Sequence, residues 1–97
     1  MSEDKDIIEV IKSGELTRIY FNEFAIGLSK NDMFILLRRD GKEEAILNAS
    51  HTSAKTLALS LMEAINEFEA KIGQPVLTSD ELERLMEDSS NVLEPSK

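Results

Sequence analysis

The feature that most constrains the fold is an Asp-Gly pair between two strand-like segments. Residues 33–39 and 42–48 are rich in apolar side chains, and Asp40-Gly41 separates them. Both residue types tolerate positive φ, which a two-residue type I′ turn requires at both of its central positions. The sequence therefore predicts a tight antiparallel hairpin over residues 33–48.

A two-residue turn also predicts the register of this hairpin. Arg39 would lie opposite Lys42, Arg38 opposite Glu43, and the pairs further from the turn follow one residue at a time. In this register the apolar side chains fall on two faces: Phe34, Leu36, Ala45 and Leu47 on one, and Met33, Ile35, Leu37 and Ile46 on the other. Leu37 would lie opposite Glu44, and both faces would be apolar at their centres.

Residues 16–29 have the apolar content of an extended segment. Their face preference sharpens after Asn22-Glu23, which predicts either a bulge there or two short strands that join at that point. Residues 29–32 are typical of a turn. We therefore expect an antiparallel sheet of three to four strands over residues 16–49.

A long amphipathic helix is expected over residues 50–73. Apolar residues recur at helical spacing from Ala54 to Ile72, and Ser50 is the expected N-cap, with Thr52 and Ser53 as alternatives. Gly73 stands where a left-handed C-cap residue would, and Pro75 prevents continuation of the helix. We expect this stripe to pack on one face of the sheet, on either Phe34/Leu36/Leu47 or Met33/Ile35/Ile46.

The two ends of the chain each predict a short element. Residues 1–14 fit a short helix that ends at Gly14, or an extended arm, because the same residues are β-branched. Thr78 and Glu81 form a capping box, which predicts a helix over residues 78–88. A loose tail is expected over residues 89–97. The whole chain, residues 1–97, is expected to form a single domain.

Composition excludes several classes of function. The chain has 97 residues, a formal net charge of −8 and no cysteine, so disulfides, thiolate metal sites and thiol nucleophiles are excluded. The charge disfavours nucleic acid and anionic lipid. The longest apolar run, residues 33–37, is too short to span a membrane. No signal peptide is evident, and these features together favour a cytoplasmic protein.

The middle of the chain resembles a widespread prokaryotic family of small uncharacterised proteins, a domain of unknown function. The resemblance covers Tyr20 to Gln74 and is best where the third strand enters the helix, at residues 50–57, and at the helix end, Phe68-Glu69 and Ile72-Gly73. His51 stands where the family often has proline. The resemblance implies a β-meander followed by a helix, and it implies no activity.

The sequence provides little for catalysis or metal binding. His51 is the only histidine, and Glu63 and Glu67 are the best carboxylate pair. A site built from these three residues is one hypothesis. A solvated helix face explains the two carboxylates as well, and a helix-entry loop explains the histidine. No nucleophile–base set, P-loop or dinucleotide loop is present. We therefore expect no enzyme activity, no catalytic or metal residues, no cofactor and no small-molecule substrate.

The hairpin tip supplies the one basic cluster. Arg38, Arg39 and Lys42 gather there and could contact phosphate. Glu43 and Glu44 lie beside them, and charged side chains that protect an exposed strand edge explain the cluster equally well. Nucleic-acid association through these three residues is therefore kept as the alternative function.

The expected fold class is α+β, a small antiparallel sheet followed by a long helix, with short helices at both ends. If the helix covers one apolar sheet face, the other needs a cover. A second copy could supply it, as could the segments around Ile7–Ile11 and Leu82–Met86. We expect an acidic homodimer that acts as a non-enzymatic protein-interaction or regulatory module. Its expected oligomer or partner surface comprises Met33, Ile35, Leu37, Ile46, Leu82, Leu85 and Met86.

Overall fold

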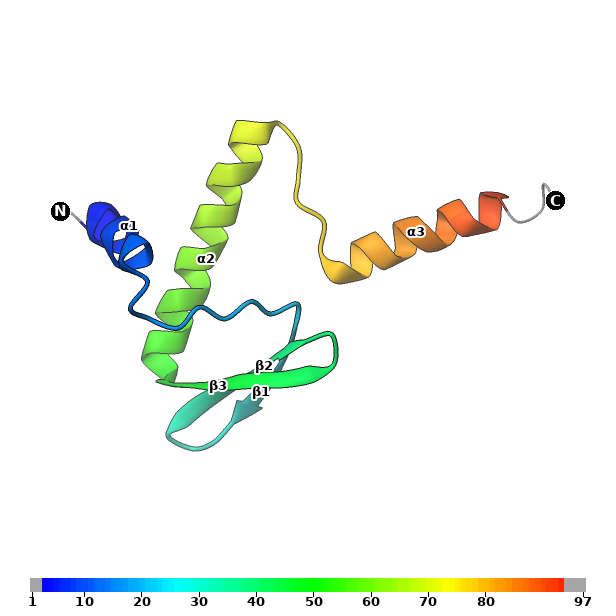
Figure 1. Cartoon of the computed structure of the whole chain (residues 1–97). Coiled ribbons are helices and arrows are strands. Elements are labelled where there is room, and N and C mark those ends of the chain that lie inside the picture. Colours follow the sequence, from blue (N-terminus) through cyan, green and yellow to red (C-terminus); the bar gives the residue numbers. More distant parts are fainter. Residues whose placement is uncertain (1–2, 94–97) are drawn as a thin grey trace. The chain divides into compact units, whose positions relative to one another are not determined.

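The computed structural model of the chain describes residues 3–93 and has the expected α+β architecture (Figure 1). The elements in chain order are α1 (Glu3–Ser13), β1 (Glu23–Leu28), β2 (Asp32–Arg39), β3 (Lys42–Ser50), α2 (His51–Ile72) and α3 (Ser79–Leu93). The three strands form one antiparallel sheet in the order β1-β2-β3. The predicted meander with a long helix after it and short helices at the ends is confirmed.

The chain forms two compact units, residues 1–55 and residues 56–97. The first unit contains α1, the sheet and the first residues of α2, and the second contains the rest of α2 and α3. The expected single domain stays a prediction, as does the packing of the Ala54–Ile72 stripe on one sheet face.

The hairpin turn forms as the Asp-Gly pair predicts. Asp40 has φ 53° and Gly41 has φ 84°, the left-handed conformation that a type I′ turn needs at both positions. Arg39 pairs with Lys42 and Arg38 with Glu43, as expected. The two-residue turn thus sets the register of the pairs next to it.

Beyond those two pairs the predicted register is wrong, because a bulge shifts it by one residue. The shift lies between Leu37 and Arg38, and Leu37 pairs with Ala45 where Glu44 was expected. A regular ladder would place the Glu44 carboxylate opposite Leu37, whose side chain is buried. The bulge leaves Glu44 without a partner across the ladder, so a carboxylate does not face a buried leucine.

The expected extended region over residues 16–29 is too long. Only Glu23–Leu28 is a strand, and residues 16–22 have no strand partner. Glu23 already pairs with Arg38, close to the end of β2, and the Asn22 backbone N–H donates to the Arg38 carbonyl at 3.0 Å. Since β2 ends at Arg39, which lies opposite Asn22 in this register, the residues before Asn22 have no β2 backbone left to pair with. Neither a bulge nor a second short strand is present at Asn22-Glu23.

Residues 3–13 form a helix, which decides between the two predicted alternatives for this segment. α1 ends at Ser13, and Gly14 follows with φ 71°, the left-handed conformation common after a helix. The Arg18 guanidinium donates to the Ile11 carbonyl at 2.8 Å and so satisfies one of the free carbonyls of the last turn. The segment after α1 is therefore tied back to that helix.

The caps of α2 and α3 match the sequence. The Ser50 hydroxyl accepts the Ser53 backbone N–H at 3.1 Å, so Ser50 is the N-cap of α2. Gly73 follows α2 with φ 77°, and its N–H donates to the Glu69 carbonyl at 2.9 Å. Thr78 and Glu81 form both bonds of the capping box: the Thr78 N–H donates to the Glu81 carboxylate at 2.9 Å, and the Glu81 N–H to the Thr78 hydroxyl at 3.3 Å.

The predicted end of the last helix is wrong. α3 continues to Leu93, past the expected end at residue 88, so part of the expected loose tail is helical. Residues 89–91, Ser-Ser-Asn, are poor helix formers in the interior of a helix but do not forbid it. The remaining tail residues, 94–97, lie outside the described residues.

Candidate functional site

The strand pairing places nine apolar residues on one face of the sheet, which we call the apolar face. Three rows cross the strands in the order β1, β2, β3: Phe24–Leu37–Ala45, Ile26–Ile35–Leu47 and Leu28–Met33–Ala49. Directly opposite residues of an antiparallel pair lie on the same side of the sheet. Every position of these three rows is therefore apolar from one edge strand to the other, and the charged pair Arg39–Lys42 follows them on the same face at the hairpin end.

The opposite side, which we call the mixed face, is apolar over a shorter stretch of the strands. Its rows are Ala25–Leu36–Ile46, Gly27–Phe34–Asn48 and Glu23–Arg38–Glu43. The apolar part forms a shallow depression lined by residues of all three strands, among them Phe34, Leu36 and Ile46. A charged row closes this face at the hairpin end. The mixed face thus offers a smaller apolar area than the apolar face does.

The apolar face is largely exposed. Among residues 6–88, whose side chains the structure describes, Leu37 is the only buried hydrophobic residue, at 4% exposure. On the edge strand β1, Phe24 is 62% exposed and Leu28 is 71% exposed. An isolated three-stranded sheet depends on burial of at least one hydrophobic face. This face is therefore a surface that needs a cover.

The structure brings three of the four predicted sheet residues together. Met33, Ile35 and Leu37 lie side by side along β2 on the apolar face. Ile46 lies on the mixed face instead, because the bulge moves every later residue of β3 to the other side. The grouping of Ala45 and Leu47 with Phe34 and Leu36 is wrong for the same reason.

Sequence reasoning missed several members of this face. The sequence predicts an extended segment that includes Phe24, Ile26 and Leu28 but does not predict their place on this surface, and it predicts Leu47 on the opposite face. One signal could have found the bulge. Two alternating sets of side chains follow one another at the end of β3. One set is entirely apolar and comprises Ala45, Leu47 and Ala49. The other comprises Ile46, Asn48 and Ser50, and its two polar residues mark the less apolar side of the sheet.

The predicted residues of the last helix are also exposed. Leu82, Leu85 and Met86 follow one another at helical spacing on α3, and each is about half exposed or more. Asp80 and Glu81 lie in the first turn, where they suit the helix dipole. The short apolar stripe on an acidic helix is therefore accessible to a partner.

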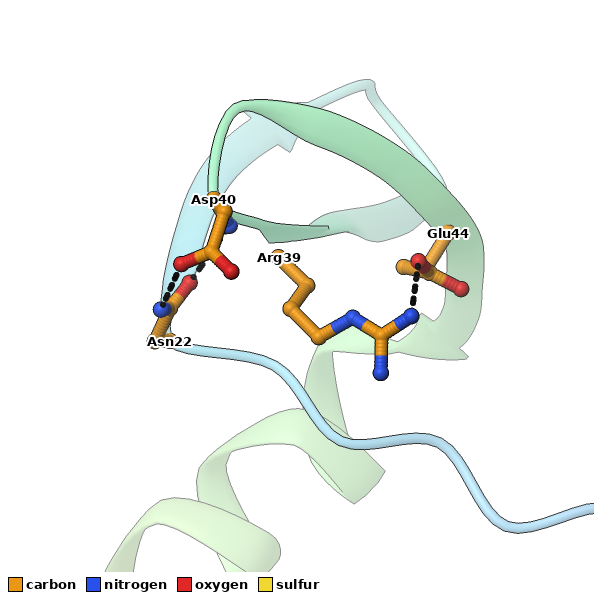
Figure 2. A network of polar contacts seen from close by, with 4 residues as sticks. All are labelled: Asn22, Arg39, Asp40 and Glu44. Carbon is orange, nitrogen blue, oxygen red and sulfur yellow. Dashed lines mark hydrogen bonds and ion pairs between the residues drawn. The ribbon is translucent and has the colours of Figure 1, made fainter.

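The hairpin tip, residues 38–44, is tied to the start of β1 by side chains (Figure 2). The Asn22 amide donates to Asp40 Oδ1 at 2.9 Å, and its oxygen Oδ1 accepts the Asp40 backbone N–H at 3.1 Å. The Gly41 backbone N–H donates to Glu23 Oε1 at 2.9 Å. Both backbone N–H groups of the turn are therefore already bonded, and neither is free for an anion.

The basic residues of the tip are partly compensated by carboxylates. Arg39 Nη2 lies 3.5 Å from Glu44 Oε2, and Figure 2 shows the two side chains extending toward each other. Arg38 lies between Glu23 and Glu43 in the ladder. With Asp40, the tip and its row hold four carboxylates against the three basic side chains Arg38, Arg39 and Lys42. This charge balance gives phosphate little attraction.

His51 has a structural contact. Its ring nitrogen Nε2 lies 3.0 Å from the Ser29 carbonyl, which can only accept, so the ring donates to the turn between β1 and β2. Glu63 and Glu67 lie on α2, in the other unit. Glu69 accepts the Val76 backbone N–H at 2.8 Å and so holds the chain after α2. Within the described part of the chain, no three His, Asp or Glu side chains group closely enough to hold a metal ion.

Comparison with known proteins adds no further assignment. No protein-family model, curated protein or solved structure matches this sequence significantly. The resemblance over Tyr20 to Gln74 therefore stays an expectation. Over residues 3–93, no helix combines the length and the apolar character needed to cross a membrane.

Proposed function

We propose that this protein is a non-enzymatic protein-interaction or regulatory module that works as a homodimer, with the apolar face as the contact between the two copies. The observation that carries the proposal is the apolar face itself, with three uninterrupted apolar rows across three strands and Leu37 alone buried. A contiguous exposed apolar surface of this kind is typical of an association site.

A second copy fits this face because the sheet does not repel itself. Residues 16–49 contain five basic and five acidic side chains, so the sheet region is formally neutral although the chain carries −8. The acidic excess lies in the end segments, with Asp6 and Glu9 in α1 and Asp80 to Asp88 in α3. Two apolar faces can therefore meet about a two-fold axis, the commonest arrangement of soluble homo-oligomers.

The stripe of α3 supports a second contact, with a different protein. Leu82, Leu85 and Met86 have the spacing by which an amphipathic helix fills an apolar groove. The acidic residues around them favour a groove with basic borders. In this proposal the sheet holds the dimer together and α3 recruits the partner.

The alternative, phosphate contact through Arg38, Arg39 and Lys42, has less support. The Arg39–Glu44 ion pair and the occupied backbone N–H groups of the turn leave few free donors at the hairpin tip. Within residues 3–93, we find no feature that favours nucleic acid over protein as the partner class.

The test of the dimer uses two neighbouring residues that lie on opposite faces of β3. Leu47→Asp places a carboxylate in the apolar face, whereas Ile46→Asp places one in the mixed face. We expect light scattering after size exclusion to show a dimer for the wild type and for Ile46→Asp, and a monomer for Leu47→Asp. The cause is the high cost of burying an unpaired charge at the contact.

Thermal unfolding at several protein concentrations gives an independent readout. The melting temperature of a dimer rises with protein concentration, because association stabilises the folded chain by mass action. A monomeric wild type with a concentration-independent melting temperature would contradict the proposal. Dissociation by Ile46→Asp alone would instead move the contact to the mixed face.

A further inference from the structure

The hairpin turn also contains the chemical group most prone to spontaneous modification in this chain. Asp40 is the only Asp or Asn residue that is followed by glycine anywhere in the sequence. Glycine has no Cβ, so its backbone nitrogen can approach the preceding side chain with little hindrance. An Asp-Gly bond is therefore the preferred position for ring closure between an aspartate side chain and the backbone.

In the folded turn, both reacting groups are held by other residues. The Asp40 carboxylate accepts from the Asn22 amide at 2.9 Å, and the Gly41 backbone N–H donates to the Glu23 carboxylate at 2.9 Å. The Asn22 oxygen also accepts the Asp40 N–H at 3.1 Å. Figure 2 shows Asn22 directly beside the Asp40 side chain. We call these three bonds the turn clasp.

We infer that Asp40 is the site of isoaspartate formation in this protein, and that Asn22 and Glu23 slow the reaction by holding the Asp40 carboxyl and the Gly41 nitrogen apart. This inference is independent of the proposed dimer, because it concerns only the hairpin tip and needs no second copy of the chain.

The reaction needs only water and the chain itself. The Gly41 nitrogen attacks Cγ of the protonated Asp40 carboxyl, a new N–Cγ bond forms, and the carboxyl hydroxyl leaves as water with the amide proton. Water then opens the cyclic imide. Addition at Cγ restores aspartate, whereas addition at the former backbone carbonyl gives isoaspartate, in which the chain continues through Cβ and Cγ. No oxidant or reductant takes part, and no net mass is gained.

The modification would have a structural consequence. The two residues of the turn bring Arg39 opposite Lys42. Isoaspartate at Asp40 would lengthen the backbone of this turn by one carbon atom. A type I′ turn has no room for this atom, because its two central residues have fixed conformations. Formation of isoaspartate at Asp40 therefore breaks the pairing of β2 with β3 next to the turn.

The clasp affects the rate through the population of reactive conformations. Ring closure requires Gly41 to leave Glu23 and Asp40 to leave Asn22. Loss of one hydrogen bond of ordinary net strength raises the population of an opened conformation by about fivefold. Glu23→Ala, which removes one bond, should accelerate the modification by about that factor, and Asn22→Ala, which removes two, by at least as much. Glu23→Gln, whose amide oxygen can still accept, should stay near the wild-type rate.

The test follows isoaspartate at each site during prolonged incubation of the full chain in heavy-oxygen water. Each opening of the cyclic imide incorporates one heavy oxygen, and peptide mapping assigns it to a residue. Asn31→Ala is the matched control, because Asn31 lies in the other turn of the sheet, between β1 and β2. Wild-type protein in concentrated urea gives the rate without the clasp, so the comparison stands even if a variant does not fold.

The expected result is incorporation at Asp40 that is slow in the folded wild type and in Asn31→Ala, faster in Asn22→Ala and Glu23→Ala, and fastest in urea. Equal rates at Asp40 in the folded wild type and in urea would overturn the protective role of the clasp. Incorporation mainly at another aspartate in urea would overturn the assignment of the site.

Discussion

The ends of the sheet and its apolar face differ in how many of their side chains have a partner. At the hairpin end, Asn22 and Glu23 bond to Asp40 and Gly41, and at the other end His51 bonds to the Ser29 carbonyl. Between these ends, the side chains of the apolar face remain largely exposed. The polar side chains at the two ends of the sheet thus have hydrogen-bond partners, whereas the hydrophobic side chains between them remain largely exposed.

This difference indicates which property each region provides. Hydrogen bonds at the ends are directional, so they hold turns and register, but each contributes only about 1 kcal/mol net. Burial of apolar surface is non-directional and provides most of the free energy of folding. The ends therefore define the shape of the sheet, and its stability depends on what covers the faces.

The largest expected effect is at the buried residue of the apolar face. Leu37→Ala should lower the free energy of unfolding by about 3 kcal/mol, because it removes a buried side chain and leaves a cavity. Ile46→Ala, on the exposed mixed face, is the control and should cost less than about 1 kcal/mol. Urea denaturation measures both. Equal losses would show that the two faces are covered alike.

A smaller effect is expected at the hairpin end. Asn22→Ala removes both side-chain bonds to Asp40 and should cost about 1–2 kcal/mol. Hydrogen exchange should then be faster at the amides of Asp40 and Arg39 than at those of Met33, far from the tip. Exchange that increases uniformly along β2 would argue against a local role for Asn22.

The other end should be less sensitive. His51→Ala removes the single bond to the Ser29 carbonyl, so the expected loss is about 1 kcal/mol. Lys55→Ala, on the same helix, serves as the control and should have little effect. A loss at His51 as large as that at Leu37 would mean that His51 does more than hold this turn.

The smallest effect is expected at the ion pair of the tip. Arg39 is exposed, so Arg39→Ala should change the free energy of unfolding by less than about 0.5 kcal/mol. The same residue tests the alternative function. At low salt and micromolar protein, a gel-shift assay should show no retardation of DNA or RNA by the wild type. Retardation that Arg39→Ala abolishes would favour nucleic acid over the proposed module.

Much of the fold could be predicted because its signals are local. The Asp40-Gly41 turn, the Ser50 cap and the Thr78–Glu81 capping box each depend on residues within a few positions of one another. The expected extended segment over residues 16–29 forms a strand only from Glu23 for a non-local reason, because β2 ends at Arg39 and leaves the residues before Asn22 without a partner. The end of α3 was misplaced because a weak stop signal at residues 89–91 did not end the helix.

The candidate site was predicted only in part. Met33, Ile35 and Leu37 share a face because alternation along one strand is a local property. Ile46 was misplaced because one unpaired residue, Glu44, reverses the orientation of everything after it. Phe24 and Leu28 belong to the apolar face because β1 lies beside β2 in a particular register. The alternation of residues within one strand specifies neither the neighbouring strand nor that register.

By itself the sequence determined the type and order of the elements, the turn and the caps, since neighbouring residues encode these through backbone preference and short-range hydrogen bonds. Only the tertiary structure decided the register beyond Arg38, the length of β1 and the contact of Asn22 with Asp40. Each of these joins residues far apart in the chain. The physical reason is that a ladder can shift by one residue at little local cost, and only the side chains that would then be brought face to face penalise the wrong choice.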